Sequence, residues 1–270
     1  MCRDLKLGEV TPTVLKAAHH TTLLLSPLKL VARVQSAEPI DAARLRAIKE
    51  VAVARHLAHR HAPALAPLEE WAGPHVAASS VVTLWPYVAH ERTADEADAT
   101  LAATTLAFVH RALLDYGGEL PPYTQALDRC WAVLADDEAI AALTGRDKDL
   151  LRTQYRRLRR GIETTISSWV PLHGDAHLGN LLLGGRGPLW GDFEDACLGP
   201  REYDIAGLPF AAWSHFSDAD QALARHYADL KSVCVAIWCW ADISRSAEVR
   251  EAAEYHLRQV RELALSDGPC

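Results

Sequence analysis

Apolar residues alternate with polar ones in the first third of the chain, and this pattern predicts a small β-rich region. Residues 21–26 and 28–34 are rich in residues favoured in strands, and the proline between them predicts an antiparallel pair. Residues 41–60 have the apolar spacing of a helix, for which Asp41 is the expected N-cap. A third strand is predicted at residues 80–85. This part of the chain therefore combines strands with one helix.

After His90 the apolar spacing becomes helical, apart from a compact strand-and-loop segment at residues 169–199. The pattern predicts an α+β, two-lobed fold with a small antiparallel β-rich N-lobe and a large helical C-lobe. We expect the N-lobe at residues 1–84, a hinge at 85–91 and the C-lobe at 92–270. A cleft between two lobes is a common place for a ligand. The predicted helices of the second part are residues 95–114, 124–143, 147–166, 217–243 and 247–265.

Composition narrows the class of protein. The 270 residues are 49% apolar and 23% charged, which is typical of a globular chain and excludes wholesale disorder. The formal charge of −7 argues against a nucleic-acid partner and favours a cationic or neutral small substrate. The chain has no apolar run of membrane-spanning length and no signal-peptide pattern, and its six cysteines form no C-x-x-C pair. We therefore expect a cytoplasmic protein with reduced thiols and no membrane partner.

The segment that carries chemistry begins at His173 and reads H-G-D-A-H-L-G-N, followed by G-D-F-E around Asp192. Turns between short apolar strands direct Asp175, Asn180 and Asp192 toward one end of a hairpin. Such a set suits phosphoryl transfer, because one carboxylate can accept the proton of an attacking hydroxyl. The amide oxygen and the other carboxylate can hold Mg²⁺ on phosphate oxygens. Alone, each of these residues would be read as a turn cap.

These residues resemble the aminoglycoside phosphotransferase and choline kinase group, the small-molecule relatives of protein kinases. The resemblance rests on H-G-D-x-x-x-x-N ending at Asn180, on the Asp192 stretch, and on G-P-x-x-Y-D at residues 199–204. It implies a protein-kinase-like fold and a phosphotransferase that uses ATP (or GTP) and Mg²⁺. It further implies that Asp175 is the catalytic base, that Asn180 and Asp192 are metal ligands, and that His173 supports the loop.

In the N-terminal part the resemblance identifies candidate phosphate-positioning residues. Aligning V-A-R-V with the kinase V-A-x-K strand puts Arg33 where the family has lysine, and Glu50 is its natural partner. Lys29 is an alternative phosphate contact. No G-x-G-x-x-G stretch occurs in the first 40 residues, where Gly8 is the single glycine. Cover for the phosphates is therefore expected from another turn, near residues 19–22.

The stretch Trp85-Pro-Tyr87-Val88 resembles the hinge that hydrogen-bonds adenine through its main chain. The resemblance assigns Trp85, Tyr87 and Val88 to nucleotide binding. The apolar surface of these side chains is equally suited to core between the lobes.

The sequence does not identify the phosphate acceptor, which could be an aminoglycoside, an amino alcohol, a sugar or another antibiotic. Aromatic side chains could receive a choline-like cation through their π faces, whereas an aminoglycoside would call for several carboxylates. The candidates in the C-terminal part are Trp213, His215, Trp238 and Trp240 for the first, and Asp204, Asp218, Asp220 and Asp242 for the second.

Other functions compete with phosphotransfer. A kinase-fold nucleotide-binding regulator with little catalysis would account for Arg33 and for the missing glycine loop. A metallohydrolase would use His173, Asp175 and His177 as zinc ligands, but no further His or Cys pattern follows. An arginine-rich run could indicate nucleic acid, yet on a helix it is more typical of a solvated face. That run contains Arg152, Arg156, Arg157, Arg159 and Arg160.

Overall fold

The computed structural model describes residues 5–17, 20–36, 39–163, 168–185 and 187–266. The chain forms two compact units. The first contains Met1–Leu120 and Pro171–Leu198, and the second contains Pro121–Val170 and Gly199–Cys270. The predicted α+β class, an antiparallel sheet region followed by helices, is confirmed. The predicted division at a hinge of residues 85–91 stays a prediction.

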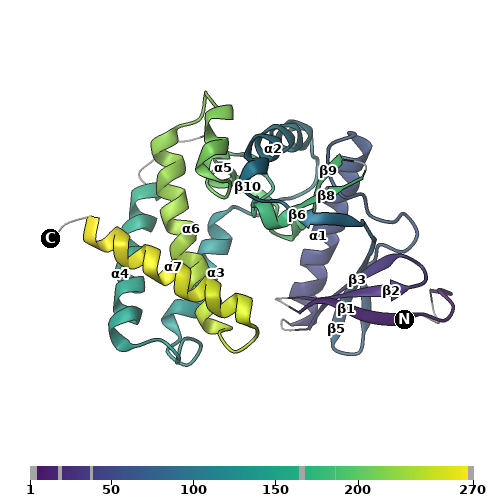
Figure 1. Cartoon of the computed structure of the whole chain (residues 1–270), viewed down its shortest axis with the longest axis horizontal. Helices are drawn as coiled ribbons and strands as arrows, with labels where there is room; N and C mark the ends of the chain where they lie inside the picture. The colour runs from purple at the N-terminus through teal and green to yellow at the C-terminus, as the bar shows by residue number, and fades with distance from the viewer. Residues whose placement is uncertain (1–4, 18–19, 37–38, 164–167, 186, 267–270) are drawn as a thin grey trace. The chain divides into compact units, whose positions relative to one another are not determined.

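An antiparallel sheet dominates the first unit (Figure 1). In the described residues its strands follow the order β1-β2-β3-β5-β4. The three strands predicted from alternation correspond to β2, β3 and β5, whose inward-facing residues form one apolar cluster. The strands are β1 (Thr11–Ala17), β2 (Thr21–Ser26), β3 (Leu30–Gln35), β4 (His75–Ala77) and β5 (Ser80–Pro86).

Helix α1 (Ile40–His59) packs against β5 and lies alongside the sheet (Figure 1). Small buried residues on its inner face, Ala43 and Ala47, form a cluster with Val81 of β5. The expected N-cap was wrong by two positions, because the helix is preceded by Pro39. Asp41 lies in the first turn instead, where a carboxylate is favoured by the partial positive charge of the helix N-terminus.

A second layer of the first unit carries the chemical segment. Strands β6 (His90–Thr93), β8 (Leu181–Gly184) and β9 (Gly187–Trp190) form a small antiparallel sheet, and helix α2 (Ala99–Leu113) packs against β9. Trp190 is buried and its Nε1 donates a hydrogen bond of 2.9 Å to Thr105 Oγ1 of α2. The hairpin β8–β9 is thereby fixed on a rigid support. Short strands β7 (Val170–Leu172) and β10 (Cys197–Gly199) pair at the two ends of this segment.

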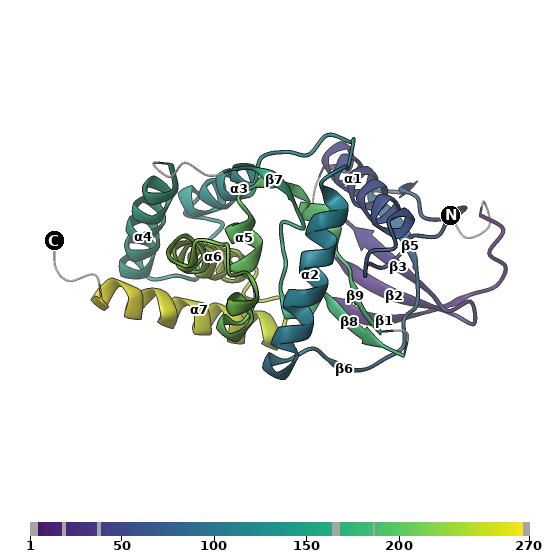
Figure 2. The ribbon, with the colours of Figure 1, turned by 90° about the horizontal axis from the view of Figure 1, so that it is seen from above.

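The second unit is helical and is built around α6, which is seen nearly end-on in Figure 2. Helices α3, α4, α5 and α7 all pack against it. Its buried residues recur every three to four positions, among them Leu223, Tyr227, Leu230 and Ile237, as an amphipathic helix requires. The helices are α3 (Thr124–Ala135), α4 (Gly145–Glu163), α5 (Arg201–Ile205), α6 (Gln221–Ala241) and α7 (Ala247–Ser266).

One helix of the second unit is shorter than predicted. The apolar spacing predicted a helix over residues 124–143, but α3 ends at Ala135. Asp136 Oδ1 accepts hydrogen bonds from the main-chain N–H groups of Glu138, at 2.9 Å, and Ala139, at 3.3 Å. These local bonds favour turns over a further helical turn. Of the predicted helix 147–166, the last residues lie outside the described part of the chain. In that described part no helix is both long and apolar enough to span a bilayer.

Candidate active site

The loop between β7 and β8 holds Asp175 and Asn180 together. Asn180 Nδ2 donates hydrogen bonds to the main-chain oxygen of Asp175, at 2.9 Å, and to its Oδ2, at 3.3 Å. The amide nitrogen of Asn180 is thereby directed toward Asp175, which leaves its amide oxygen outside these two bonds. The Asp175 side chain is 49% exposed, so a molecule from solvent can reach it.

His173 anchors this loop from behind. The residue is completely buried, and its Nε2 donates a hydrogen bond of 3.0 Å to the carbonyl of Gly191. Its Nδ1 accepts from the main-chain N–H of Asp175 at 3.4 Å, and its ring lies 4.5 Å from that of Phe193. With both nitrogens engaged, His173 cannot serve as the zinc ligand of a metallohydrolase. Across the described residues, no group of three or more His, Cys, Asp or Glu side chains could hold a metal.

The loop and the segment after β9 approach too closely for any residue but glycine at position 174. Gly174 has φ +88°, and a Cβ there would lie 1.9 Å from the carbonyl oxygen of Asp195. An alanine would therefore force the two segments apart. This close approach explains the glycine of the H-G-D stretch.

Asp192 lies beside Asn180 because of the hairpin register. Leu181 of β8 pairs with Trp190 of β9, and the N–H of Gly191 donates to the carbonyl of Asn180 at 2.9 Å. Asp192 has φ +65°, a left-handed conformation that Asp tolerates better than most residues. Its side chain is 34% exposed. The hairpin thus brings Asn180 and Asp192 to one end, as the turns of the sequence predicted.

Arg33 connects the large sheet to this hairpin. Its Nη1 donates to Glu50 Oε1 of α1, and its Nη2 donates to Asp192 Oδ1 at 2.9 Å. Its Nη2 also lies 3.8 Å from Glu194 Oε1. The structure therefore places Arg33, Glu50 and Asp192 together, although Asp192 is 159 residues from Arg33. The functional roles assigned to these residues stay predictions.

Buried charges surround this guanidinium. Burial lowers the pKa of Arg33, but the carboxylates of Glu50, Asp192 and Glu194 outweigh it and raise that pKa, so the residue stays charged. Burial raises the pKa of Glu50, Arg33 opposes the effect, and the neighbouring acids add to it. Glu50 is 1% exposed, and among the described residues its Oε2 has no hydrogen-bond partner. One guanidinium among several carboxylates leaves a local excess of negative charge.

Sequence reasoning missed the role of Glu194. Its Oε1 forms a hydrogen bond of 2.7 Å with His20 Nε2, and its Oε2 accepts from Gln35 Nε2 at 3.2 Å. Burial raises the pKa of Glu194, but the bond from His20 and the charge of Arg33 outweigh it and lower that pKa to about 2. His20 belongs to the turn expected to cover phosphates, whereas His19 lies outside the described residues. The acidic D-F-E-D run was the available signal for Glu194.

The residues of the predicted hinge differ in burial and in whether they belong to a strand. Trp85 is buried in β5, pairs with Val31 of β3, and donates from Nε1 to Thr83 Oγ1 at 2.9 Å, so its side chain is core. Tyr87 and Val88 are half-buried beyond the end of β5. The N–H of Tyr87 donates to the carbonyl of Lys29 at 2.8 Å, so this donor is not available to a nucleotide base.

Lys29 is not part of the strand on which the sequence placed it. It lies in the turn before β3, with φ +52° and an exposed side chain. The main-chain bond from Tyr87 holds this turn at the opposite end of β3 from Arg33. The structure therefore gives no support to Lys29 as a substitute for Arg33.

The aromatic acceptor candidates are largely structural. Trp213 is buried and donates from Nε1 to the carbonyl of Leu208 at 3.1 Å. Trp240 donates from Nε1 to the carbonyl of Ala253 at 3.1 Å, and Trp238 is half-buried two positions away on α6. His215 is exposed at the end of a 3-10 turn. These contacts account for two of the indoles without a ligand.

The acidic acceptor candidates also have structural contacts. Asp220 caps α6 by accepting from the N–H groups of Ala222, at 2.9 Å, and Leu223, at 3.0 Å. Asp204 is fully buried. The remaining two form ion pairs, Asp218 with Arg201 at 2.9 Å and Asp242 with Arg245 at 3.4 Å.

Several solved structures of similar fold are small-molecule kinases. A choline kinase from Streptococcus pneumoniae has a TM-score of 0.70 at 12% identity, with 96% of this chain and 95% of that chain covered. An amicoumacin kinase in complex with AMP-PNP, Ca²⁺ and Ami has a TM-score of 0.66 at 13% identity, with 93% of this chain and 88% of that chain covered.

A thermostable aminoglycoside phosphotransferase mutant, in a ternary complex with AMP-PNP and hygromycin B, has a TM-score of 0.66 at 14% identity. Coverage is 98% of this chain and 97% of that chain. The predicted protein-kinase-like fold is thereby confirmed. No curated protein matches the sequence. The model of the phosphotransferase enzyme family matches residues 19–244, which is most of the chain. The resemblance seen in H-G-D-x-x-x-x-N and G-D-F-E is confirmed, and the chain belongs to the phosphotransferase enzyme family.

Proposed function

We propose that this small-molecule phosphotransferase transfers the γ-phosphate of ATP or GTP, with Mg²⁺, to a hydroxyl group of its acceptor. The observation that carries the proposal is the hydrogen-bonded pair of Asp175 and Asn180 beside Asp192, which Arg33 and Glu50 hold from the sheet side. Phosphoryl transfer requires little covalent chemistry from the protein, so positioning and charge are the main contributions of such a set.

Asp175 is the proposed catalytic base. Its half-exposed carboxylate can accept a hydrogen bond from the acceptor hydroxyl and then the proton of that hydroxyl. Asn180 and the buried His173 fix the main chain of Asp175, which limits the motion of the carboxylate. His177 Nε2 lies 3.3 Å from Asp175 Oδ2, so this imidazole is in reach of the proposed base.

The residues present fit a magnesium ion. Asn180 and Asp192 lie on paired segments at one end of the hairpin and can offer an amide and a carboxylate oxygen, and Mg²⁺ is usually held by one or two carboxylates together with substrate phosphates. The excess negative charge around Arg33 favours a cation there. When bound, Mg²⁺ would neutralise charge on the phosphate oxygens. Glu194 is an unsuitable ligand, because His20 and Gln35 occupy its two oxygens.

Arg33 is the proposed phosphate-positioning residue in place of lysine. Its planar fork holds Glu50 with one arm and Asp192 with the other, which a single ammonium group cannot do in the same geometry. The nucleotide base is proposed to bind along residues 85–88. Since the Trp85 side chain is core, the main chain of this stretch is the proposed contact; the N–H of Tyr87, which is bonded to Lys29, is not part of it.

The acceptor is proposed to be a small molecule that carries a hydroxyl group and an amine. The similar structures are named for choline, amicoumacin and hygromycin B, which favours this class. A net charge of −7 suits a cationic acceptor.

The proposal is tested with Asp175→Asn, which keeps the hydrogen-bonding shape of the side chain but removes the base. ADP release with a panel of amino alcohols and aminoglycosides is expected to fall by about 10²–10⁴-fold, the usual contribution of a general base. The thermal shift caused by Mg²⁺ and ATP or GTP should persist, because a ligand bound by the folded state raises the midpoint.

Asp149→Asn, an exposed carboxylate on α4, is the matched control and should retain full turnover. Full turnover in Asp175→Asn would overturn the role of the base. A magnesium-dependent nucleotide shift without turnover in the wild type, across the panel, would favour the nucleotide-binding regulator.

A further inference from the structure

Helix α4 carries a row of positive charge that the proposed phosphotransfer does not use. Between Gly145 and Glu163 the chain has seven basic and three acidic residues, although the protein as a whole has a charge of −7. Lys148, Arg152, Arg156 and Arg160 follow one another at intervals of four, which places neighbours on the same side of the helix. Solvation of an exposed face is the ordinary explanation for such a row.

The two halves of this row differ. Asp137 neutralises the first half, because its Oδ1 lies 3.3 Å from Lys148 Nζ and 2.9 Å from Arg152 Nη2. In the second half, among the side chains that the structure describes, no carboxylate lies within ion-pair distance of Arg156 or Arg160. In the first half, one carboxylate oxygen thus contacts two cations that lie one helical turn apart. An oxygen anion could contact Arg156 and Arg160 in the same way.

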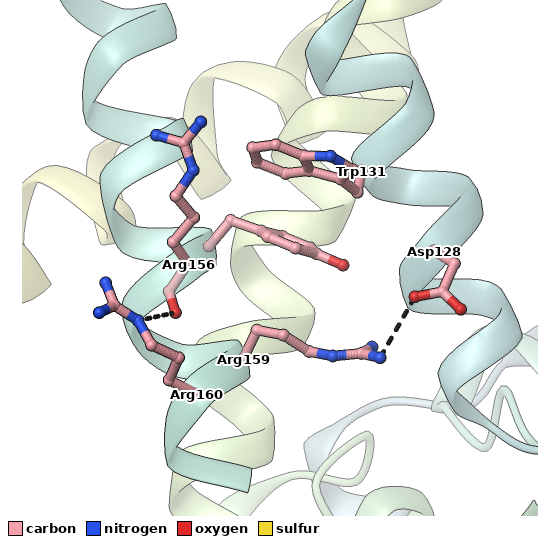
Figure 3. A pocket seen from close by; sticks show the side chains of 6 residues that line it. Asp128, Trp131, Arg156, Arg159 and Arg160 are labelled. Carbon is pink, nitrogen blue, oxygen red and sulfur yellow. Dashed lines mark hydrogen bonds and ion pairs between the residues drawn. The ribbon is translucent and has the colours of Figure 1, made fainter. Parts of the chain in front are cut away.

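A pocket adjoins the second half of the row (Figure 3). Its volume is about 420 Å³, and α3 and α4 supply its walls. Arg159 points across the pocket to Asp128, 3.2 Å away, and in Figure 3 it extends away from Arg156 and Arg160. Three arginines and one aspartate give the lining a charge of +2. The lining residues are Asp128, Trp131, Tyr155, Arg156, Arg159 and Arg160.

Two aromatic rings form the apolar part of this pocket. Trp131 and Tyr155 lie with ring centroids 5.4 Å apart and an interplanar angle of 31°. Tyr155 is buried, and its hydroxyl donates to the carbonyl of Leu127 at 2.5 Å, so its ring is fixed. The guanidinium of Arg156 lies 4.8 Å from the centre of the Trp131 ring. Ring surface and the Arg156 cation therefore meet at one place, and Arg160 follows one helical turn later, where its Nε donates to the carbonyl of Arg156 at 3.2 Å.

We propose that this pocket binds a small organic phosphate, whose phosphate group pairs with Arg156 and Arg160 and whose planar ring lies against Trp131 and Tyr155. A phosphate monoester near neutral pH carries about −1.5 to −2 charges, which matches the +2 of the lining. Guanidinium groups bind phosphate oxygens through paired hydrogen bonds, and they do so more specifically than ammonium groups. Exposed arginine side chains change rotamer within nanoseconds, so both can turn to one anion.

The test is calorimetric titration of the full chain with phenyl phosphate, benzoate and inorganic phosphate. Phenyl phosphate should bind most tightly, because it alone offers both the ring and a dianion. Arg156→Gln combined with Arg160→Gln should weaken it at least about tenfold, since hydrogen bonds between charged groups are the strong ones. The matched control, Arg250→Gln with Arg258→Gln on exposed positions of α7, removes the same charge and should leave affinity unchanged.

The role of the ring is tested separately. Trp131→Leu should abolish the preference for phenyl phosphate over inorganic phosphate, and Trp131→Phe should keep most of it. Thermal midpoints of all variants report whether the fold is retained. Equal affinity in the arginine double variant would place the phosphate elsewhere, for example at the proposed nucleotide site, and would overturn the proposal. Absence of wild-type binding at millimolar phenyl phosphate would overturn it as well.

Discussion

The two compact units differ in where they keep charged groups. The first unit buries Glu50 and keeps Arg33 half-buried, and Arg33 connects this pair to Asp192, 159 residues away, and to Glu194. The second unit packs its helices around the apolar face of α6, and most of its ion pairs have at least one exposed partner, as in Arg159 with Asp128. The second unit also has a fully buried carboxyl group, that of Asp204.

This difference separates function from stability. A buried ion pair rarely stabilises a fold more than a well-packed apolar pair would, because both charges lose their hydration. Charges that are fixed in a site can stabilise the charge that develops in the transition state. They do so without a cost of reorganisation, because the fold already holds them in place. We infer that the buried charges of the first unit serve phosphotransfer. The apolar face of α6 in the second unit mainly serves stability.

The largest expected effect on stability comes from breaking the buried cluster of the first unit. Arg33→Gln leaves Glu50 buried without a cation, so the free energy of unfolding should fall by about 3–5 kcal/mol. Adding Glu50→Gln should restore much of this loss without restoring phosphotransfer. Denaturant unfolding and ADP release measure the two quantities. Arg55→Gln, an exposed position on α1, is the control and should change stability by less than about 0.5 kcal/mol. Recovery of activity in the double variant would contradict a functional role for the cluster.

The sequence predicted the elements that have strong alternation or helical spacing. The strands predicted at residues 21–26, 28–34 and 80–85 correspond to β2, β3 (Leu30–Gln35) and β5, because each of these strands contributes an apolar face to one core. Strands β1 and β4 were missed. Both lie at the edges of the sheet, and β1 is largely exposed, so neither has a strict apolar alternation. Edge strands depend on pairing with a neighbour, which a single segment does not reveal.

The proximity of the candidate residues was predictable where they lie close in sequence. Turns and spacing predicted that Asp175, Asn180 and Asp192 come together, and the hairpin register brings Asn180 next to the Asp192 segment. His20 and Gln35 could not be assigned to Glu194 in this way. Their contacts join residues 174 and 159 positions apart, and only the tertiary fold determines them. Arg33 and Glu50 were paired by resemblance to a kinase strand and helix, and periodicity alone would not have paired them.

In the second unit an apolar truncation should lower stability and leave the chemistry intact. Leu230→Ala removes a completely buried side chain from α6, and the free energy of unfolding should fall by about 2–5 kcal/mol. Under conditions where the protein stays folded, the KM for nucleotide should not change. Leu265→Ala on α7 is the control, because that side chain is 82% exposed and contributes little. A large change in nucleotide KM in Leu230→Ala would contradict the assignment of phosphotransfer to the first unit and of stability to the second.

The smallest expected change in the free energy of unfolding comes from a polar contact of the second unit. The change should depend on pH, which distinguishes it from the effect of an apolar truncation. Asp147 Oδ1 accepts from Arg261 Nη2 at 2.7 Å, and its Oδ2 accepts from Thr144 at 2.7 Å. Burial raises the pKa of Asp147, but Thr144 and Arg261 outweigh it and lower that pKa below its ordinary value of 3.8.

Because the folded-state pKa of Asp147 is the lower one, its carboxylate stabilises the fold above pH 3.8, and this contribution is lost as the pH falls through the folded-state pKa. Asp147→Asn should therefore cost about 1–3 kcal/mol at neutral pH and progressively less in acid. Denaturant unfolding of both proteins over a pH series measures this convergence. ADP release per folded molecule should be unchanged, in contrast to Arg33→Gln. If the free energies of unfolding of the two proteins differ by the same amount at every pH, Asp147 acts through packing. The electrostatic explanation of this contact would then be wrong.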